Sequence, residues 1–487
     1  MKGLLSILFF IFYAEISAQE NQYEQMKREL NENSLPLVNM IVDVSLLNNS
    51  KFVSGEIEIS DWFRRTDPNA DVVRFFCKYR IRGGTASGFD KKSFAVKLYN
   101  ENEDELDANI FGIREDNSWI LDAMAIDRIR MRNRICFDVW NEMSQTPYET
   151  KYENRNGTKG VFVEVFINGN YNGLYCMTDK IDRKLLGLKK TKINEDGSVA
   201  VKGIMYKGIN WKKGYNLLSY EERDTNMKTW NSWELQYPDD YPSIDTWQPL
   251  MDLIDFCSDS TSDDIFVKEY QNFFYTENLV DYAVFTMAMN VGDNGYKNTF
   301  LSVVDITKGH RYMLSPWDMD MSLGGNYDGD YNENVSHVDR YDKKAPFNRL
   351  NVRNIDGFKD FEVSKWIKYH NTLFSPQSIS NRMDNYAKSF TSSGAWEREY
   401  TKWNGNPVPL KHDIADELAY VKEWYVKNHD SLCAQFGTDK LDIIDNSNNE
   451  VVKVNNEGAV YDLAGCRLNT PFKKGIYLIN GKKVVVR

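Results

Sequence analysis

The chain has 487 residues, of which 42% are hydrophobic and 14% aromatic, and these values exclude an intrinsically disordered protein. Its 60 Lys and Arg against 71 Asp and Glu give a net charge of −11, so no nucleic-acid partner is expected without a local basic patch, and none stands out. The six cysteines are scattered without a CxxC pair, which predicts buried free thiols and no zinc site.

The first predicted element is a secretory signal peptide over residues 1–18. The start "MKGLLSILFFIFYAEISAQE" has Lys2, a short apolar run and small residues before Gln19, and the run is too short to span a bilayer. No later apolar run approaches the length of a transmembrane helix. The mature protein is therefore expected to be exported, with a periplasmic, cell-surface or extracellular location and no transmembrane span.

Residues 19–35 are polar and expected to be a flexible segment, and residues 36–180 are expected to form a β-rich lobe. The stretches "SGEIEIS", "VVRFFCKYRIRGG" and "KSFAVKLY" alternate with period two, which predicts an antiparallel sheet. In "IDRIRMRNRICFDVWNEM" the apolar residues share one helical face, so a helix is expected to pack on that sheet. The next stretch, "GVFVEVFINGNYNGLYCMTDKID", predicts two strands joined at "NGNYNG".

Residues 181–438 are expected to be mainly helical. Helical periodicity recurs in "WQPLMDLIDFC", "TENLVDYAVFTMAM", "FEVSKWIKYHNTLF" and "IADELAYVKEWYVKNH". Before them lies an irregular segment rich in Trp and Tyr, between residues 205 and 247, which is interpreted as an insertion or covering segment. The tail, residues 446–487, contains short alternating strands and is expected to be a separate small β module.

One constellation of polar residues carries the predicted chemistry. Asp293 and Asn298 are five residues apart, and "SPWDMD" follows across a strand–turn–strand centred on Lys308-Gly309. A hairpin of that length returns the chain beside its start, so Asp318 is expected near Asn298 and Asp293. Protein kinases use this order of groups: one Asp orients the hydroxyl nucleophile, while an Asn and a second Asp hold Mg²⁺ on the phosphates.

Together, the segments "RIRGGTASGFDKKSFAVKLY", "INGNYNGLYCMTDKID", "GDNGYKNTFL" and "SPWDMDMSLGG" resemble the CotH-like family of atypical, secreted or spore-coat protein kinases. The resemblance covers roughly residues 36–435. It implies an α+β, two-lobed atypical protein-kinase-like fold, with an antiparallel β N-lobe, a mainly helical C-lobe and a short C-terminal β module. The implied reaction transfers the γ-phosphoryl group of ATP to Ser or Thr of a protein, with Mg²⁺ or Mn²⁺.

The resemblance also implies roles for individual residues. Asp293 is the catalytic Asp, Asn298 and Asp318 are the metal ligands, and Asp320 assists as a further carboxylate. In the amino-terminal lobe, Lys92 and Lys97 are alternative phosphate lysines, with Lys92 favoured by its place in the KKS segment, and Arg82 begins a turn whose backbone N–H groups face phosphates. Two further nucleotide-binding positions are implied: Arg132 matches an Arg-Asn pair of the family, and Asp179 lies in the lobe connection that would meet adenine, where a Glu is expected.

Each of these segments also has a plain structural interpretation. "GDNG" alone is most often a turn, "PWD" caps a helix or bends a strand, and "RGGTASG" alone is a surface loop. Arg130, Arg132 and Arg134 are more often salt-bridged than bound to phosphate. The tail is similar to carboxy-terminal sorting modules of exported Bacteroidetes proteins, which would engage export machinery, or is a small β appendage. A different function class also stays open, a surface binding or adhesion protein that retains the fold and uses the aromatic residues between 205 and 247.

Overall fold

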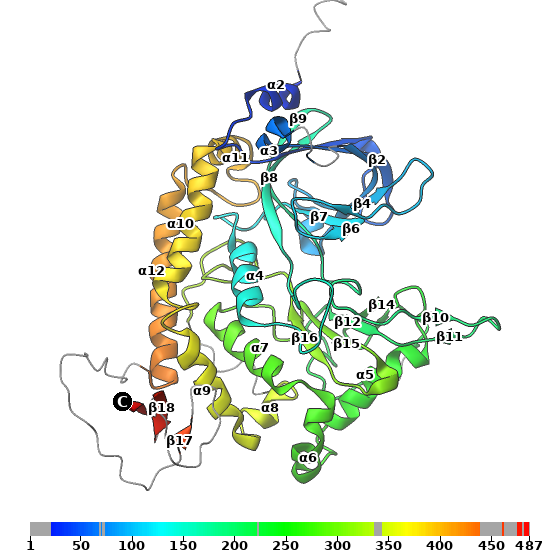
Figure 1. Cartoon of the computed structure of the whole chain (residues 1–487), viewed down its shortest axis with the longest axis vertical. Helices are drawn as coiled ribbons and strands as arrows, with labels where there is room; N and C mark the ends of the chain where they lie inside the picture. Colours follow the sequence, from blue (N-terminus) through cyan, green and yellow to red (C-terminus); the bar gives the residue numbers. More distant parts are fainter. Residues whose placement is uncertain are drawn as a thin grey trace, which may run out of the picture. The chain divides into compact units, whose positions relative to one another are not determined.

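The computed structural model describes residues 21–67, 70, 74–221, 224–335 and 343–438, and the backbone of three strands within 460–486. The chain divides into two compact units (Figure 1). Unit 1 comprises Met1–Arg130, Lys159–Asp179 and Asp384–Ala415, and unit 2 comprises Met131–Thr158, Lys180–Met383 and Asp416–Arg487. This division differs from the expected boundary at residue 180. Residues 131–158, expected in the first lobe, belong to unit 2, and residues 384–415, expected in the second lobe, belong to unit 1. The predicted signal peptide lies outside the described residues.

A closed seven-stranded barrel forms the centre of unit 1. In barrel order its strands are β1 (Leu37–Val42), β2 (Val53–Ser60), β3 (Arg74–Arg82), β4 (Ser93–Tyr99), β7 (Ser118–Asp122), β9 (Asn170–Thr178) and β8 (Gly160–Ile167). The expectation of a purely antiparallel sheet is wrong at one seam, where β1 and β8 run parallel, with Val38 opposite Val165. Pairing of strands so distant in the sequence has no local signature, and closure leaves the barrel without exposed edge strands.

The predicted hairpin between β8 and β9 is confirmed. Its turn residues Asn168 and Gly169 have φ values of 49° and 80°, and Ile167 pairs with Asn170. Positive φ at both central residues is the geometry that an Asn-Gly turn favours between twisted strands. The alternating apolar side chains of the barrel strands meet in one core cluster that includes Val38, Val96 and Tyr175. The hairpin therefore completes a hydrophobic interior that the period-two patterns predicted.

Among the described residues, three α-helices lie wholly in unit 1: α2 (Gln22–Glu29), α3 (Trp62–Thr66) and α11 (Ala395–Trp403). Helix α2 lies within residues 19–35, where a flexible segment was expected. Asn21 caps it by accepting a hydrogen bond from the Glu24 N–H, and Tyr23 is fully buried against Phe166 of β8. Apolar contact with the barrel compensates for the polar composition of this helix, because packing contributes more to short helices than propensity does.

Unit 2 contains a five-stranded antiparallel sheet that carries the candidate catalytic segments. Its order is β13 (Thr229–Trp230), β14 (Trp233–Tyr237), β12 (Ile204–Gly208), β15 (Thr299–Val303) and β16 (Met313–Pro316). Three of these strands come from the segment that was interpreted as an irregular insertion. Asn231 and Ser232, with φ values of 48° and 75°, form the two-residue turn between β13 and β14, a sequence that is a weaker turn signal than Asn-Gly.

The four predicted helical stretches are all helices in the structure. They correspond to α5 (Ile244–Cys257), α7 (Thr276–Ala288), α9 (Phe358–Tyr369) and α12 (Ile414–Gln435). Helix α4 (Arg132–Met143) also forms, and within unit 2 its Trp140 ring contacts Tyr282 and Phe285 of α7 edge-on. The other α-helices in the part of the chain that the structure describes are α6 (Asp263–Phe273), α8 (Phe347–Leu350) and α10 (Pro376–Ser392).

The tail contains a three-stranded antiparallel sheet of β17 (Val460–Tyr461), β18 (Gly475–Ile479) and β19 (Lys482–Val486). Short two-stranded sheets are formed by β5 (Ala108–Asn109) with β6 (Glu115–Asp116), and by β10 (Lys192–Ile193) with β11 (Val199–Ala200). The five cysteines described by the structure are free thiols, and all except the half-buried Cys433 are buried. Within the described part of the chain, no helix has the length and apolarity needed to cross a membrane.

Candidate active site

The loop between α7 and β15 contains Asp293 and Asn298, and Asn294 determines its shape. The Asn294 side chain is 1% exposed, and its Nδ2 donates hydrogen bonds of 2.9 Å to the carbonyl oxygens of both Asn298 and Trp317. Its own carbonyl accepts a hydrogen bond from the Tyr282 hydroxyl of α7. A single buried amide therefore joins the loop to the segment that follows β16. No role for Asn294 was predicted from the sequence.

The Asp293 carboxylate is surrounded by hydrogen-bond donors. Lys297, four residues later, forms an ion pair with Oδ2, and Asn298 Nδ2 lies 3.5 Å from the same oxygen. Trp211 Nε1 donates to Oδ1 at 3.2 Å. The side chain of Asp293 is 15% exposed. These contacts hold a partly buried carboxylate in one orientation at the start of the loop.

The β15–β16 hairpin returns Asp318 to the neighbourhood of Asn298. Thr299 pairs with Pro316, and beyond this pair the Trp317 N–H donates a 2.8 Å hydrogen bond to the Asn298 carbonyl. Asp318 is the next residue along the chain and is exposed, whereas Asp320 is half-buried. The predicted strand–turn–strand is confirmed, with Gly309 at a φ of 129° after the short helix η3 (Ile306–Lys308).

The start of α4 holds the segment that carries Asp318 and Asp320. Asn133 Oδ1 accepts a 3.1 Å hydrogen bond from the N–H of Met319, the residue between the two aspartates. The side chain of Arg132 is buried and lies against Gly325, where an added Cβ would be 3.1 Å from its Nε. The neighbouring Arg134 bonds to Asp138 and to the Thr158 carbonyl. Arg132 is thus near the carboxylate segment, while Arg134 has structural contacts.

Three residues of this site other than glycine have left-handed backbone conformations. The φ values are 87° for Tyr296, 56° for Asn298 and 57° for Asp318. Asn and Asp tolerate this region, but a Tyr there is unusual and requires support from its surroundings. Tyr296 is 1% exposed, and its hydroxyl donates to the Ala345 carbonyl. Such conformations cluster at functional sites, so this observation adds to the evidence for one here.

The oxygen atoms of this loop and hairpin are the hard donors that Mg²⁺ and Mn²⁺ prefer. Because Asn298 Nδ2 faces Asp293, its Oδ1 points away from that carboxylate, and among the described residues no donor contacts this Oδ1. No group of three or more His, Cys, Asp or Glu side chains in the described part of the chain is arranged to hold a metal. The residue types fit a divalent cation, with a carboxamide and carboxylates as ligands.

Unit 1 contains four of the five residues predicted to contact the nucleotide, Arg132 of unit 2 being the fifth. Arg82 ends β3 opposite Ser93, and Gly83 follows with a φ of 105°. Lys92 Nζ donates to the Ser87 carbonyl at 2.9 Å, closing the loop between β3 and β4. Lys97 lies further along β4, 4.0 Å from the exposed Glu105 carboxylate. Arg82 and Lys92 are therefore at the same loop, and Lys97 is at a different place on the strand.

Asp179 is fully buried and has contacts of its own. Arg114 Nε lies 3.2 Å from its Oδ2, and the Lys159 N–H donates to its Oδ1 at 2.8 Å. The Asp179 N–H donates to the Lys159 carbonyl. In unit 1 this residue connects the end of β9 to the start of β8. An adenine contact from its side chain stays a prediction.

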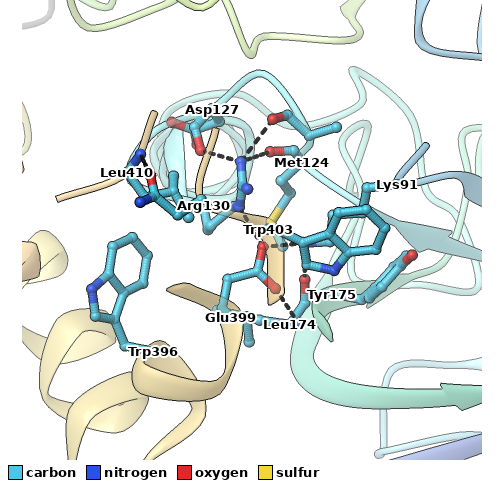
Figure 2. A network of polar contacts seen from close by, with 12 residues as sticks. Lys91, Met124, Asp127, Arg130, Leu174, Tyr175, Trp396, Glu399, Trp403 and Leu410 are labelled. Atoms are coloured by element: carbon cyan, nitrogen blue, oxygen red, sulfur yellow. Dashed lines mark hydrogen bonds and ion pairs between the residues drawn. The ribbon is translucent and has the colours of Figure 1, made fainter. Parts of the chain in front are cut away.

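A buried network around Glu399 was not foreseen (Figure 2). Glu399 of α11 accepts hydrogen bonds from Lys91 Nζ at 2.6 Å, from Arg130 Nε at 2.7 Å and from the Leu174 N–H at 2.8 Å. All three charged side chains are 0% exposed. Lys91 Nζ also donates to the Leu174 carbonyl. Because Lys91 is held in this way, the adjacent Lys92 has a fixed backbone position.

Burial controls the ionisation of this network. It lowers the pKa of Lys91 to about 7, because loss of solvation outweighs the attraction of Glu399, and Arg130 adds repulsion. Burial alone would raise the pKa of Glu399, but the charges of Lys91 and Arg130 lower it below its usual value. Glu399 is therefore the anion that the network stabilises, and Lys91 is the cation that burial disfavours.

The aromatic segment between residues 205 and 247, on which the binding-protein alternative depends, contains both buried and exposed side chains. Trp230 is 2% exposed, and Trp233 and Trp247 are fully buried. Trp211 is 41% exposed and contacts Asp293. Of the nine Trp and Tyr residues in this segment, four are buried, four are half-buried and Trp211 is exposed, so the segment contributes to the core of unit 2 and also has exposed aromatic surface, a distinction that composition alone does not make.

A protein-family model described as "CotH kinase protein" matches residues 79–432. No curated protein sequence matches the chain. The matched range contains Asp293, Asn298 and Asp318 as well as Lys91 and Glu399 of the buried network.

Proposed function

The chain belongs to the CotH kinase family, and we propose that it is an exported kinase that transfers the γ-phosphoryl group of ATP to Ser or Thr of a protein. The observation that supports this most directly is the hydrogen bond between the Trp317 N–H and the Asn298 carbonyl. It brings together segments 293–298 and 317–320, which carry the functional groups that phosphoryl transfer needs.

In the proposed reaction, a bond forms between the acceptor oxygen and the γ-phosphorus while the bond from that phosphorus to the bridging oxygen of ADP breaks. Asp293 orients the acceptor hydroxyl and receives its proton. Lys297, paired with Asp293, adds positive charge beside the transferred group. Asn294 keeps the loop and the hairpin in register.

Asn298, Asp318 and Asp320 would hold Mg²⁺ or Mn²⁺, which when bound supplies positive charge to the phosphates of ATP. The left-handed backbone at Asn298 and Asp318 supports this assignment, because strained positions persist where side chains must point in a required direction. Arg82, Lys92, Lys97, Arg132 and Asp179 stay predictions for nucleotide contacts, each of which can be tested by its own substitution.

The test is incubation of the purified mature chain with γ-labelled ATP and a candidate protein acceptor, with Mg²⁺ or Mn²⁺, followed by mapping of labelled residues. Labelled Ser or Thr in the wild type, absent in Asp293→Asn, is expected. If calorimetry detects no binding of ATP with either metal, the kinase proposal fails and a binding protein that retains the fold is favoured.

We propose that the protein is exported, on the basis of the predicted signal peptide over residues 1–18 and the resemblance of the tail to a sorting module. Each of these two segments has a separate test. Amino-terminal sequencing of secreted protein is expected to begin at or near Gln19, and an intact Met1 on such material would contradict cleavage. Truncation after Thr438 is expected to preserve ATP binding and to change where the protein accumulates. A truncated chain that fails to fold would show that the tail belongs to the core.

A further inference from the structure

Trp211 brings a distant segment of the chain to the candidate catalytic carboxylate. It lies between β12 and β13, 82 residues before Asp293, and its Nε1 donates to Asp293 Oδ1 at 3.2 Å. The proposed roles of the loop 293–298 and the hairpin do not account for this contact. Trp211 is also one of the exposed large hydrophobic residues, at 41%. It therefore has both solvent access and a polar contact with Asp293.

The hydrogen bonds of Asp293 leave Oδ1 able to accept one further hydrogen bond. A carboxylate offers about four acceptor positions, two on each oxygen. Lys297 and Asn298 both contact Oδ2, whereas Trp211 is the donor to Oδ1 among the described residues. The remaining position is consequently on Oδ1, beside the indole. An acceptor hydroxyl that meets Asp293 there would lie next to Trp211.

The indole ring is held by contacts of its own. Lys344 Nζ lies 4.6 Å from the centre of the Trp211 ring, and the Tyr215 ring meets it edge-on at 5.2 Å. Lys344 is 7% exposed and packs against Gly295, where an added Cβ would collide with Nζ. Gly295 belongs to the same loop as Asp293. The ring of Trp211, despite its exposure, therefore has a fixed place over this loop.

We propose that Trp211 is the acceptor-side positioning residue of this kinase: its N–H fixes Asp293 so that the open side of Oδ1 meets the acceptor hydroxyl. This inference rests on the proposed phosphoryl transfer and adds a residue that lies within the matched range 79–432 but outside the motif segments 293–298 and 317–320. It also gives the segment after β12 a function at the site, in place of a separate adhesive surface.

The test is Trp211→Phe, which removes the N–H but keeps an aromatic ring for Lys344 and Tyr215. Loss of a hydrogen bond to a charged group is expected to change a rate or an equilibrium constant by about tenfold or more. The kcat for the protein acceptor should therefore fall by about that factor. The KM for ATP and the melting temperature should stay unchanged. Trp62→Phe is the matched control, since Trp62 is 37% exposed and lies in α3.

A double-mutant cycle separates positioning from a general structural effect. If Trp211 acts through Asp293, Trp211→Phe should have no further effect on residual transfer in an Asp293→Asn background. Wild-type kcat in Trp211→Phe, or a lower melting temperature together with lost ATP binding, would overturn this inference and leave the kinase proposal in place. A wild-type protein that transfers no phosphate would overturn the proposed function, and this inference with it.

Discussion

The N–H of Trp317 donates a 2.8 Å hydrogen bond to the carbonyl of Asn298, and this pair joins the two segments of the candidate active site. Asp318 follows Trp317 directly, and Asp293 lies within hydrogen-bonding range of the Asn298 side chain. The β15–β16 hairpin sets this register, since Thr299 is opposite Pro316.

Asp293→Asn is expected to separate nucleotide binding from transfer. The substitution keeps the shape of the side chain but removes the group proposed to receive the proton, and such groups contribute about 10²- to 10⁴-fold. Calorimetric titration with ATP and Mg²⁺ should give an affinity close to that of the wild type, while phosphate transfer falls by that factor. Transfer at the wild-type rate would show that another group acts as the base.

Asp318→Asn is expected to weaken both properties. It removes the proposed hard anionic ligand, and electrostatic groups of this kind contribute about 3 kcal/mol or more to the transition state. Metal-dependent ATP binding and transfer should therefore both decrease, the latter by about a hundredfold or more. The control is Asp328→Asn, in an exposed turn where the carboxylate accepts from the Asp330 N–H. Equal effects of the two substitutions would contradict the metal assignment.

Asn294→Ala is expected to lower the free energy of unfolding and to reduce transfer. It removes the donor shared by the carbonyls of Asn298 and Trp317, and although the Asn298 carbonyl keeps the Trp317 N–H, loss of the two hydrogen bonds from this buried amide should cost about 1–3 kcal/mol. Urea unfolding measures the first effect and labelled ATP the second. Asn226→Ala, at an exposed residue bonded locally to Asp224, should change neither quantity. A stable variant with full activity would show that the loop holds its shape without this amide.

Gly173→Ala is expected to disrupt the buried network of unit 1. The glycine has a φ of 127°, and a Cβ there would lie 2.7 Å from Trp403 Nε1 and 2.8 Å from Glu399 Oε2. Backbone strain and displacement of a buried carboxylate together should cost about 3 kcal/mol or more in unfolding free energy. At Gly84 an added Cβ meets nothing within 4 Å, so Gly84→Ala is the matched control. Similar melting temperatures for the two variants would contradict this expectation.

Lys91 is expected to make the free energy of unfolding rise with pH above about 7. Its pKa is about 7 in the folded protein, against 10.5 for an ordinary lysine, so between these values the unfolded chain binds more protons. The contribution of Lys91 to the free energy of unfolding should increase between about pH 7 and pH 10.5, by at most about 1.4 kcal/mol per pH unit, and should be constant below about pH 7.

Urea unfolding between about pH 6 and 9 measures this dependence before most tyrosines titrate. Lys91→Met should lose the slope that the wild type shows. Lys92→Met should keep it, because Lys92 is half-exposed and bonded to the Ser87 carbonyl. A slope that persists unchanged in Lys91→Met would assign the titration to another group.

Local patterns in the sequence are sufficient to predict the strands of unit 1, the Asn168-Gly169 hairpin, five of the helices and the hairpin that carries Asn298 and Asp318. These features depend on side-chain periodicity and turn chemistry among residues that are close in the chain. The order of Asp293, Asn298 and Asp318 also suffices to propose the reaction, because a hairpin of known length returns the chain beside its start.

Tertiary structure alone decides which residues support that site. Lys91 and Glu399 are 308 residues apart, Asn133 and Met319 are 186 apart, and Trp211 and Asp293 are 82 apart. Lys91 and Lys92 are adjacent lysines, and the sequence motif favoured Lys92 for a role, yet it is Lys91 that is buried while Lys92 is half-exposed. The parallel β1–β8 seam and the burial of Trp233 are likewise invisible to local pattern. The physical reason is that burial and pairing depend on which distant segments pack together, and hydrophobic packing is not encoded in any short stretch of residues.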